Sequence, residues 1–316
     1  MSKPHMLLIG NASARSLERL DAVFTVHRMP EDRDAFLAQH GGDIEYVMAS
    51  GGGGVPGALM EKLPGLKIVS NYGVGYDSVD VATAVRRKVV VSHTPNVLND
   101  EVANTAIMLL LTTARNFVHD NQYLRSGRWA KDGDAPLSRG IAGCRVGILG
   151  LGRIGLATAE KLAVFGVDVV YHGRSKRDVP YHYYDDLTDM ARDVDILISI
   201  APGGASTLKI INREVMDALG PEGILINVGR GSVVDEDALI AALQDGRLGK
   251  AGLDVFANEP NVPQALIDLP NATLLPHVGS ATVETRQAMG DLAVENLTAF
   301  HATGKAVTPV PECREM

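Results

Sequence analysis

The segment VGILGLGRIGLATAEKL, residues 146–162, limits the possible folds more than any other stretch of the chain. An apolar run ends at three glycines spaced as G-x-G-x-x-G, namely Gly150, Gly152 and Gly155, and a helix-like segment follows at once. The first glycine permits a tight turn, the second lets a pyrophosphate approach the backbone, and the third lets helix and strand pack closely. The start of the helix also attracts anions. A glycine-rich turn without a ligand is the alternative, but the strand before and the helix and strand after favour a dinucleotide site.

Short apolar runs alternate with helix-like segments along the whole chain. Four runs are predicted strands in the first hundred residues: 5–10, 45–50, 66–70 and 88–92. A second series comprises residues 145–150, 167–173, 195–200, 223–228, 250–256 and 272–277. Continuous apolar strands separated by helices are typical of parallel sheets that are covered on both faces. The predicted fold class is therefore α/β, with two Rossmann-like, doubly wound parallel-sheet domains and a cleft between them.

Two long amphipathic segments, residues 98–127 and 280–304, are predicted helices that connect the domains. One face of each is apolar, with Leu98, Val102, Ala106 and Leu110 in the first and Met289, Ala293, Leu297 and Phe300 in the second. We expect residues 98–286, which contain the glycine motif, to form a dinucleotide-binding Rossmann domain. Residues 1–97 and 287–316 are then expected to form the substrate-binding (catalytic) domain.

The composition excludes several classes of protein. The 316 residues carry a formal net charge of −8, whereas a nucleic-acid binder normally has a basic excess. The two cysteines, Cys144 and Cys313, match neither a metal-ligand spacing nor a disulfide framework, and they fit a reducing compartment. No apolar stretch approaches the roughly 20 residues of a membrane span. We expect a soluble cytoplasmic protein with no nucleic-acid partner, no membrane partner and no metal.

The residues after the predicted strand 167–173 indicate which dinucleotide binds. A site for NAD usually has an acidic residue roughly 20 residues beyond the glycines, where it binds the ribose hydroxyls. This chain has Gly173, Arg174, Ser175 and Lys176 there instead. A guanidinium can stack on adenine and bind a phosphate with two hydrogen bonds. The turn therefore favours NADP(H), with NAD(H) still possible and a solvated basic turn as the alternative.

Three later loops carry one reactive side chain each, at the predicted ends of three consecutive strands: Arg230, Glu259 and His277. Reduction of a 2-keto acid needs a cation for the carboxylate and an acid for the carbonyl oxygen. It also needs a carboxylate that orients the acid. Taken singly, each of the three residues could be structural. Their order and placement together favour an active site, because ligands bind at the carboxyl ends of strands in open α/β sheets.

With these residues in view, the sequence resembles the D-isomer-specific 2-hydroxyacid dehydrogenases over nearly its whole length. The resemblance rests on NYGVGYDSVD, TPNVLNDEVA, VGILGLGRIG, INVGRG, GLDVFANEP and LLPHVGSAT, in this order. Within the family the chain is most similar to NADP-dependent glyoxylate, hydroxypyruvate and hydroxyphenylpyruvate reductases. The resemblance implies reduction of small 2-keto acids to D-2-hydroxy acids. It also implies a homodimer formed through the cofactor domain, for which the 120–144 loop, with the only tryptophan, Trp129, is the expected arm.

The resemblance implies a role for each matching residue. Arg230 would bind the substrate carboxylate and carbonyl, His277 would be the general acid, and Glu259 would pair with His277. The expected substrate-binding residues are Val74 and Gly75, through their backbone, with Ser50, Gly51 and Arg230. The run Gly51–Gly54 fits either a flexible loop or a roomy substrate lip. Asp254 is expected to meet the nicotinamide carboxamide. The expected cofactor-binding residues are Gly150, Gly152, Arg153, Ile154, Gly155, Gly173, Arg174, Ser175, Lys176, Ala201, Pro202, Val228, Gly229, Arg230, Asp254, His277 and Gly279.

Two other functions remain as alternatives. The first is a dinucleotide-sensing interaction protein of the corepressor type, which the intact set of Arg230, Glu259 and His277 disfavours. The second is an NAD-dependent dehydrogenase of the phosphoglycerate or lactate type, which the missing acidic residue after Tyr171 disfavours. Which 2-keto acid is used stays open, since selectivity for one small side chain over another is usually worth only about 1–3 kcal/mol.

Overall fold

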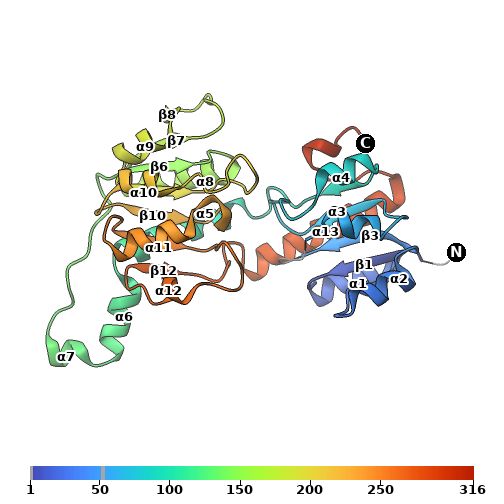
Figure 1. Ribbon diagram of the computed structural model, residues 1–316, viewed down its shortest axis with the longest axis horizontal. Coiled ribbons are helices and arrows are strands. Elements are labelled where there is room, and N and C mark those ends of the chain that lie inside the picture. Colours follow the sequence, from blue (N-terminus) through green and yellow to red (C-terminus); the bar gives the residue numbers. More distant parts are fainter. Residues whose placement is uncertain (1–2, 51–53) are drawn as a thin grey trace. The chain divides into compact units, whose positions relative to one another are not determined.

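The computed structural model describes residues 3–50 and 54–316, which form two compact units. One unit contains the chain up to Leu98 and again from Thr282 onward, and the other runs from Asn99 to Ala281 (Figure 1). The chain thus leaves the second unit a few residues before the expected boundary at 286/287. It does so because the whole C-terminal helix, which Thr282 caps through its hydroxyl, packs against the first unit.

The first unit is a five-stranded parallel sheet in the order β2-β1-β3-β4-β5. Its strands are β1 (His5–Ile9), β2 (Thr25–Arg28), β3 (Ile44–Ala49), β4 (Ile68–Asn71) and β5 (Val90–Ser92). Its helices are α1 (Ala14–Val23), α2 (Arg33–His40), α3 (Gly57–Glu61), α4 (Val81–Arg86), α13 (Val283–Thr303) and the 3-10 turn η3 (Pro311–Cys313). The four strands predicted here are confirmed. Strand β2 was missed because it is a short edge strand, TVHR, with little apolar pattern.

Helix α13 supplies part of the core of the first unit. Its residues Ala293, Val294 and Leu297 are fully buried in the same cluster as the apolar residues of β1, β3 and β4. The Ser70 hydroxyl donates a hydrogen bond of 2.9 Å to the Ala293 carbonyl and thereby ties the helix to β4. The expected apolar face of residues 280–304 is therefore confirmed, and the C-terminal segment is an integral part of this unit.

The second unit is a seven-stranded parallel sheet in the order β12-β11-β10-β9-β6-β7-β8. Its strands are β6 (Arg145–Leu149), β7 (Asp168–His172), β8 (His182–Tyr184), β9 (Ile196–Ser199), β10 (Ile224–Asn227), β11 (Lys250–Leu253) and β12 (Ala272–Leu274). Its helices are α5 (Asn99–Ala114), α6 (Phe117–Arg125), α7 (Arg128–Asp132), α8 (Arg153–Leu162), α9 (Leu187–Asp193), α10 (Arg213–Leu219), α11 (Glu236–Gln244) and α12 (Gln264–Ile267). Two 3-10 turns, η1 (Ala163–Phe165) and η2 (Gly231–Val233), complete it. The six predicted strands are confirmed, and the short edge strand β8 was missed.

The strand order reverses beside β6, which lies between β7 and β9. This is the topological switch point, where the loops after β6 and β9 diverge and ligands bind in open α/β sheets. On the far side of β9, strands β10, β11 and β12 are neighbours. Because all strands are parallel, the loops that carry Arg230, Glu259 and His277 leave the same edge of the sheet side by side.

The segment 98–127 is two helices and not the single helix expected. Helix α5 ends at Ala114, and Asn116 adopts a left-handed conformation with φ of 52° before α6 begins. The Lys250 ammonium donates to Asn116 Oδ1 at 2.6 Å and to the Ala114 carbonyl at 3.3 Å. The second bond gives a donor to a carbonyl that the end of α5 leaves without a partner inside the helix. Residues 128–132, expected to be loop, form α7. Figure 1 shows α6 and α7 extending away from the sheet of their unit.

Along the described ranges 3–50 and 54–316, no helix is both long enough and apolar enough to cross a lipid bilayer.

Candidate active site

The three glycines of the loop after β6 occupy three different environments. Gly150 has a φ of 96°, and a Cβ there would lie 3.0 Å from the Ala201 amide nitrogen. A Cβ on Gly155 would lie 2.4 Å from the Gly150 carbonyl oxygen, whereas one on Gly152 would meet nothing within 4 Å. Gly152 is also the N-cap of α8, and no side chain caps that helix. Gly150 thus makes the turn, Gly155 allows helix and strand to pack closely, and Gly152 leaves the uncapped start of α8 open. This arrangement fits a bound pyrophosphate, as expected from the motif.

The basic turn after β7 is held at its two ends and exposed between them. Tyr183 Oη donates to the Gly173 carbonyl at 3.2 Å, and the Arg177 amide donates to Tyr171 Oη at 2.7 Å. The Arg177 guanidinium also donates to the Leu151 carbonyl of the glycine loop. Between these points Arg174, Ser175 and Lys176 are exposed. Their side chains have no hydrogen bond or ion pair within the described chain, so they are available to a phosphate group. Arg177 was not expected to join the two loops.

The loop after β10 is shaped by Asn227, a buried residue that the sequence analysis did not single out. Its Oδ1 accepts from the Gly229 amide at 3.1 Å, and its Nδ2 donates to the Arg230 carbonyl at 2.9 Å. Gly231 then lies against the next loop, because a Cβ there would be 1.9 Å from the Phe256 carbonyl carbon. The loop that carries Arg230 is thus pressed onto the loop that carries Glu259. A buried asparagine at the end of a strand was the signal that could have identified this residue.

Glu259 and His277 form a direct pair. His277 Nδ1 lies 2.7 Å from Glu259 Oε2, while Glu259 Oε1 accepts from the Phe256 amide at 3.0 Å. His277 itself has a left-handed backbone, with φ of 53°, an uncommon conformation for a residue other than glycine. With Nδ1 turned to the carboxylate, Nε2 is the ring nitrogen that can reach a substrate. The imidazole is 47% exposed, so a ligand can approach it.

The surroundings of Glu259 keep its carboxylate ionised. Burial acts to raise the pKa of Glu259, but the hydrogen bonds from His277 and the Phe256 amide and the charges of His277 and Arg230 outweigh it. The pKa of Glu259 is therefore lowered from its ordinary value. Because the Arg230 charge is one of these causes, the three side chains lie in one electrostatic environment. The structure thus pairs the imidazole of His277 with the carboxylate of Glu259, and the charge of Arg230 acts on that carboxylate.

Asp254 has a positioning role that was not expected. Its side chain is almost fully buried, and its two oxygens accept from the Val278 and Gly279 amides at 2.7 and 2.8 Å. Burial raises the pKa of Asp254 despite these two hydrogen bonds, and a Cβ on Gly279 would lie only 2.9 Å from Asp254 Oδ2. The carboxylate therefore holds the backbone immediately after His277. Its contact with a nicotinamide stays a prediction.

The remaining expected cofactor residues surround the switch point. Ala201, Val228 and Gly229 are buried, and a Cβ on Gly229 would lie 2.5 Å from the Ala201 carbonyl oxygen. The loops after β9 and β10 therefore meet through their backbones. Arg153 and Pro202 are exposed and Ile154 is half-buried, so these side chains are accessible to a ligand.

In the first unit, the loop after β4 presents free amides. Asn71 Nδ2 donates to the Gly73 and Gly75 carbonyls at 3.3 and 2.9 Å. The amides of Val74 and Gly75 have no acceptor in the described part of the chain, and successive free N–H groups of this kind bind anions. Ser50 is buried and its hydroxyl donates to the Asn11 carbonyl, which leaves only its oxygen lone pairs for a ligand. Gly51 lies outside the described residues.

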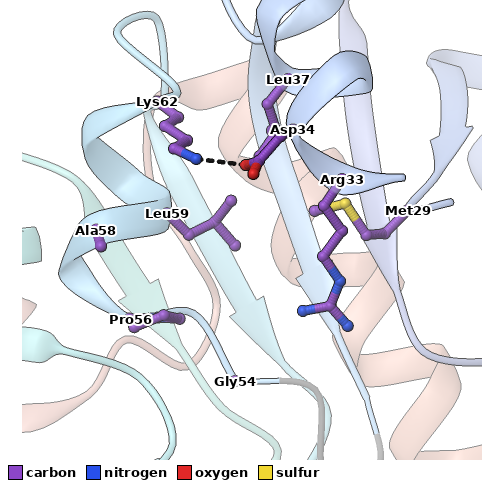
Figure 2. A pocket seen from close by; sticks show the side chains of 9 residues that line it. All are labelled: Met29, Arg33, Asp34, Leu37, Gly54, Pro56, Ala58, Leu59 and Lys62. Carbon is purple, nitrogen blue, oxygen red and sulfur yellow. Dashed lines mark hydrogen bonds and ion pairs between the residues drawn. The ribbon is translucent and has the colours of Figure 1, made fainter. Parts of the chain in front are cut away.

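A separate small pocket lies between α2 and α3 of the first unit (Figure 2). Figure 2 shows Lys62 facing Asp34 across one end of it, and their ion pair measures 2.6 Å. Its volume is about 180 Å³, below the roughly 300–1,000 Å³ of typical ligand pockets. None of the expected site residues within the described ranges lines it. The lining residues are Met29, Arg33, Asp34, Leu37, Gly54, Pro56, Ala58, Leu59 and Lys62.

Comparison with known proteins places this geometry in a family. Residues 107–279 match the model of the D-isomer specific 2-hydroxyacid dehydrogenase, NAD binding domain. The chain is 47% identical over 297 residues to hydroxyphenylpyruvate reductase of Plectranthus scutellarioides, covering 94% of each protein. It is 46% identical to a glyoxylate/hydroxypyruvate reductase of Arabidopsis thaliana, covering 88% of this chain and 89% of that one. Among solved structures, an NADPH-dependent glyoxylate/hydroxypyruvate reductase of Sinorhizobium meliloti, in complex with NADP and malonate, is 52% identical. It superposes with a TM-score of 0.94 over 99% of this chain and 98% of that one.

The pair of Glu259 and His277 can be tested by titration. His277→Ala removes a hydrogen bond and a charge that lower the pKa of Glu259, while the opposing burial remains, so the pKa of Glu259 rises. A carboxylate with a lowered pKa adds stability that is present above its ordinary pKa and lost as the pH falls through the lowered value. The variant therefore loses this contribution at a higher pH. Carbon-13 NMR of labelled glutamate measures the shift, with Glu259→Gln to assign the signal. An unchanged titration in His277→Ala contradicts the pairing.

Proposed function

The chain belongs to the D-isomer-specific 2-hydroxyacid dehydrogenase family, and on this basis we propose that it is an NADPH-dependent reductase of small 2-keto acids. Glyoxylate and hydroxypyruvate are the proposed substrates, and glycolate and a D-2-hydroxy acid are the products. The observation that carries the proposal is the pair of Glu259 and His277, with the Arg230 charge beside it, on three adjacent loops. The relatives named as reductases of these keto acids support it.

Each side chain of the site has one task in this reaction. The Arg230 guanidinium binds the substrate carboxylate and polarises the carbonyl. The His277 imidazolium donates the proton on Nε2 to the carbonyl oxygen, and Glu259 holds Nδ1 so that Nε2 faces the substrate. NADPH, when bound, supplies the hydride that the keto carbon receives. The free amides of Val74 and Gly75 bind the substrate carboxylate.

The choice of NADP(H) rests on the turn after β7. Arg174, Ser175 and Lys176 expose two cations and a hydroxyl, and Asp178 is the first acidic residue after the strand. These groups complement a 2′-phosphate and would not repel it as a carboxylate would. The Sinorhizobium meliloti relative, which is described as NADPH-dependent, supports the same choice. NAD(H) remains a weaker second cofactor.

A dinucleotide-sensing protein without activity is not favoured, because His277, its partner Glu259 and Arg230 are all present on adjacent loops.

We also propose that the protein is a homodimer in which the segment 117–144 of one protomer covers the other. The segment exposes Phe117, Leu124, Trp129 and Leu137, and Leu137 is 99% exposed. Several large apolar side chains exposed on one segment favour an interaction site, because monomeric proteins rarely expose extended apolar surface. A second copy offers a suitable surface, an apolar hollow of about 600 Å³ between α5 and α8. Its lining residues are Asn104, Ile107, Met108, Leu111, Thr112, Lys161, Val164 and Phe165.

Cys144 and Cys313 are buried free thiols, which is consistent with the proposed cytoplasmic location.

The activity is tested by following NADPH oxidation with a panel that includes glyoxylate, hydroxypyruvate and hydroxyphenylpyruvate. We expect turnover with at least one of them, and a loss of about 10²–10⁴-fold in kcat for His277→Gln, the usual contribution of a general acid. NADPH binding, measured by fluorescence titration, is expected to weaken far less than kcat falls in this variant. Wild-type turnover in His277→Gln would rule out the proposed acid. Absence of turnover by the wild-type protein with the whole panel would rule out the proposed function.

The cofactor choice is tested by Arg174→Asp. The substitution places a carboxylate where the 2′-phosphate is expected, so KM for NADPH is predicted to rise by about tenfold or more, the effect of losing a charge-assisted hydrogen bond. The ratio of kcat/KM for NADPH to that for NADH should fall by at least the same factor. Arg213→Asp, on the exposed surface of α10, serves as the control for a change of charge. An unaltered ratio in Arg174→Asp contradicts the assignment.

The dimer is tested by sedimentation. We expect the wild-type protein to sediment at twice its chain mass of 33.6 kDa. Leu137→Asp should dissociate it, because the substitution would bury a charge in the interface while leaving the isolated protomer unaffected. Ile267→Asp, at an exposed apolar residue of α12 outside the arm, should remain a dimer. A wild-type monomer, or a dimer that Leu137→Asp does not weaken, argues against the arm.

A further inference from the structure

The directions of the free N–H groups in the loop after β4 depend on the groups that hydrogen-bond to the carbonyls of this loop. In a trans peptide, the carbonyl of one residue and the N–H of the next point in opposite directions. The Gly73 carbonyl accepts from the Thr94 amide at 2.9 Å and from Asn71, so the Val74 N–H is turned to the opposite side. The Val74 carbonyl lies 2.9 Å from His93 Nδ1, so the Gly75 N–H is turned away from His93. Each free amide is thus oriented by an identified partner behind it.

We propose that His93 is a positioning residue for the substrate carboxylate, an inference that rests on the proposed function. Its imidazole binds the Val74 carbonyl and thereby directs the Gly75 N–H into the anion-binding loop. Because a carbonyl only accepts hydrogen bonds, the proton of this pair lies on Nδ1 of His93. The ring acts on the substrate through the backbone of the loop.

Contacts to both the ring and the backbone set the position of His93, as a positioning role requires. Its ring packs edge-on against the Tyr76 ring, with centroids 5.4 Å apart and planes at 87°. The backbone of His93 is anchored to the C-terminal segment. Its N–H donates to the Thr308 carbonyl at 3.1 Å, and its carbonyl accepts from Thr308 Oγ1 at 2.6 Å. The Asn296 side chain, fully buried on α13, donates to Thr308 Oγ1 at 2.9 Å and accepts from the Thr308 amide at 2.8 Å.

These contacts give the C-terminal segment a function in addition to packing. Helix α13 and the residues after it hold His93, His93 holds the Val74 carbonyl, and the Gly75 amide is oriented as a result. The Asn71 side chain adds a parallel constraint through the Gly73 and Gly75 carbonyls. The loop would otherwise be free to rotate its peptides, because glycine at 73 and 75 allows a wide range of backbone angles.

The test compares two substitutions that differ in the hydrogen-bond donor. His93→Leu removes the donor, whereas His93→Asn retains an N–H near the place of Nδ1. For His93→Leu we expect KM for the keto acid to rise about tenfold, the effect of losing one hydrogen bond, with KM for NADPH unchanged. For His93→Asn we expect most of the wild-type KM to be recovered. Tyr46→Phe, which removes a side-chain hydrogen bond to His301 in the same unit, should leave both KM values unchanged.

A non-reacting carboxylate separates positioning from general loss of structure. Oxalate binding, measured by calorimetry, should weaken in His93→Leu by the same factor as KM, whereas partial unfolding would lower the number of sites without changing the affinity. His93→Ala replaces His93→Leu if the latter does not fold. The proposal is overturned if His93→Leu keeps the wild-type KM and the wild-type affinity for oxalate. It is also overturned if His93→Asn raises KM as much as His93→Leu does. If the wild-type protein lacks activity, the proposed function fails, and the oxalate measurement still decides the role of His93.

Discussion

The site in the second unit depends on a property of parallel sheets, which bring the carboxyl ends of all their strands to one edge. Strands β10, β11 and β12 are adjacent, so the loops of Arg230, Glu259 and His277 are neighbours although the first and the last residue are 47 positions apart in the sequence. Adjacent strands alone do not place the side chains of their loops in contact, however. Close packing of Gly231 on the Phe256 peptide brings the first two loops into contact, and the buried Asp254 carboxylate fixes the third. The reactive pair therefore rests on backbone contacts that tolerate little change.

In both units, a buried asparagine at the end of a strand determines the conformation of the glycine-containing loop that follows. Strand β10 ends at Asn227 and strand β4 ends at Asn71, and both side chains are buried. Each asparagine bonds to the backbone of the residues that follow and thus determines the direction of their peptides. In one unit the result is the placement of a guanidinium, and in the other it is a pair of free amides. Glycine supplies the conformational freedom, and the buried amide side chain selects one conformation from it.

The sequence predicted the parts of the fold whose signal is local. Apolar runs of the inner strands and the G-x-G-x-x-G turn were recognised, because burial on both faces leaves a continuous apolar pattern. The edge strands β2 and β8 were missed because TVHR and HYY are short and partly exposed. The break at Asn116 was missed because the apolar repeat continues across it, and the Lys250 ammonium that satisfies the end of α5 comes from a strand far along the chain. Arg177 and His93 had no local signal, since the partners of their side chains lie on other loops. Asn227 bonds to its own loop, and its place at the end of a buried strand was the one signal that could have identified it.

By itself, the sequence determined the fold class, the family and the chemical types of the reacting groups, because these depend on residue identity and on short-range order. Only the tertiary structure decided how those groups are held: the pairing of His277 Nδ1 with Glu259, the burial of Asp254 beneath the His277 loop, and the bond from His93 to the Val74 carbonyl. The physical reason is that a hydrogen bond requires its two atoms to meet at about 3 Å in the right direction. For partners on separate loops, the packing of the intervening chain sets that geometry.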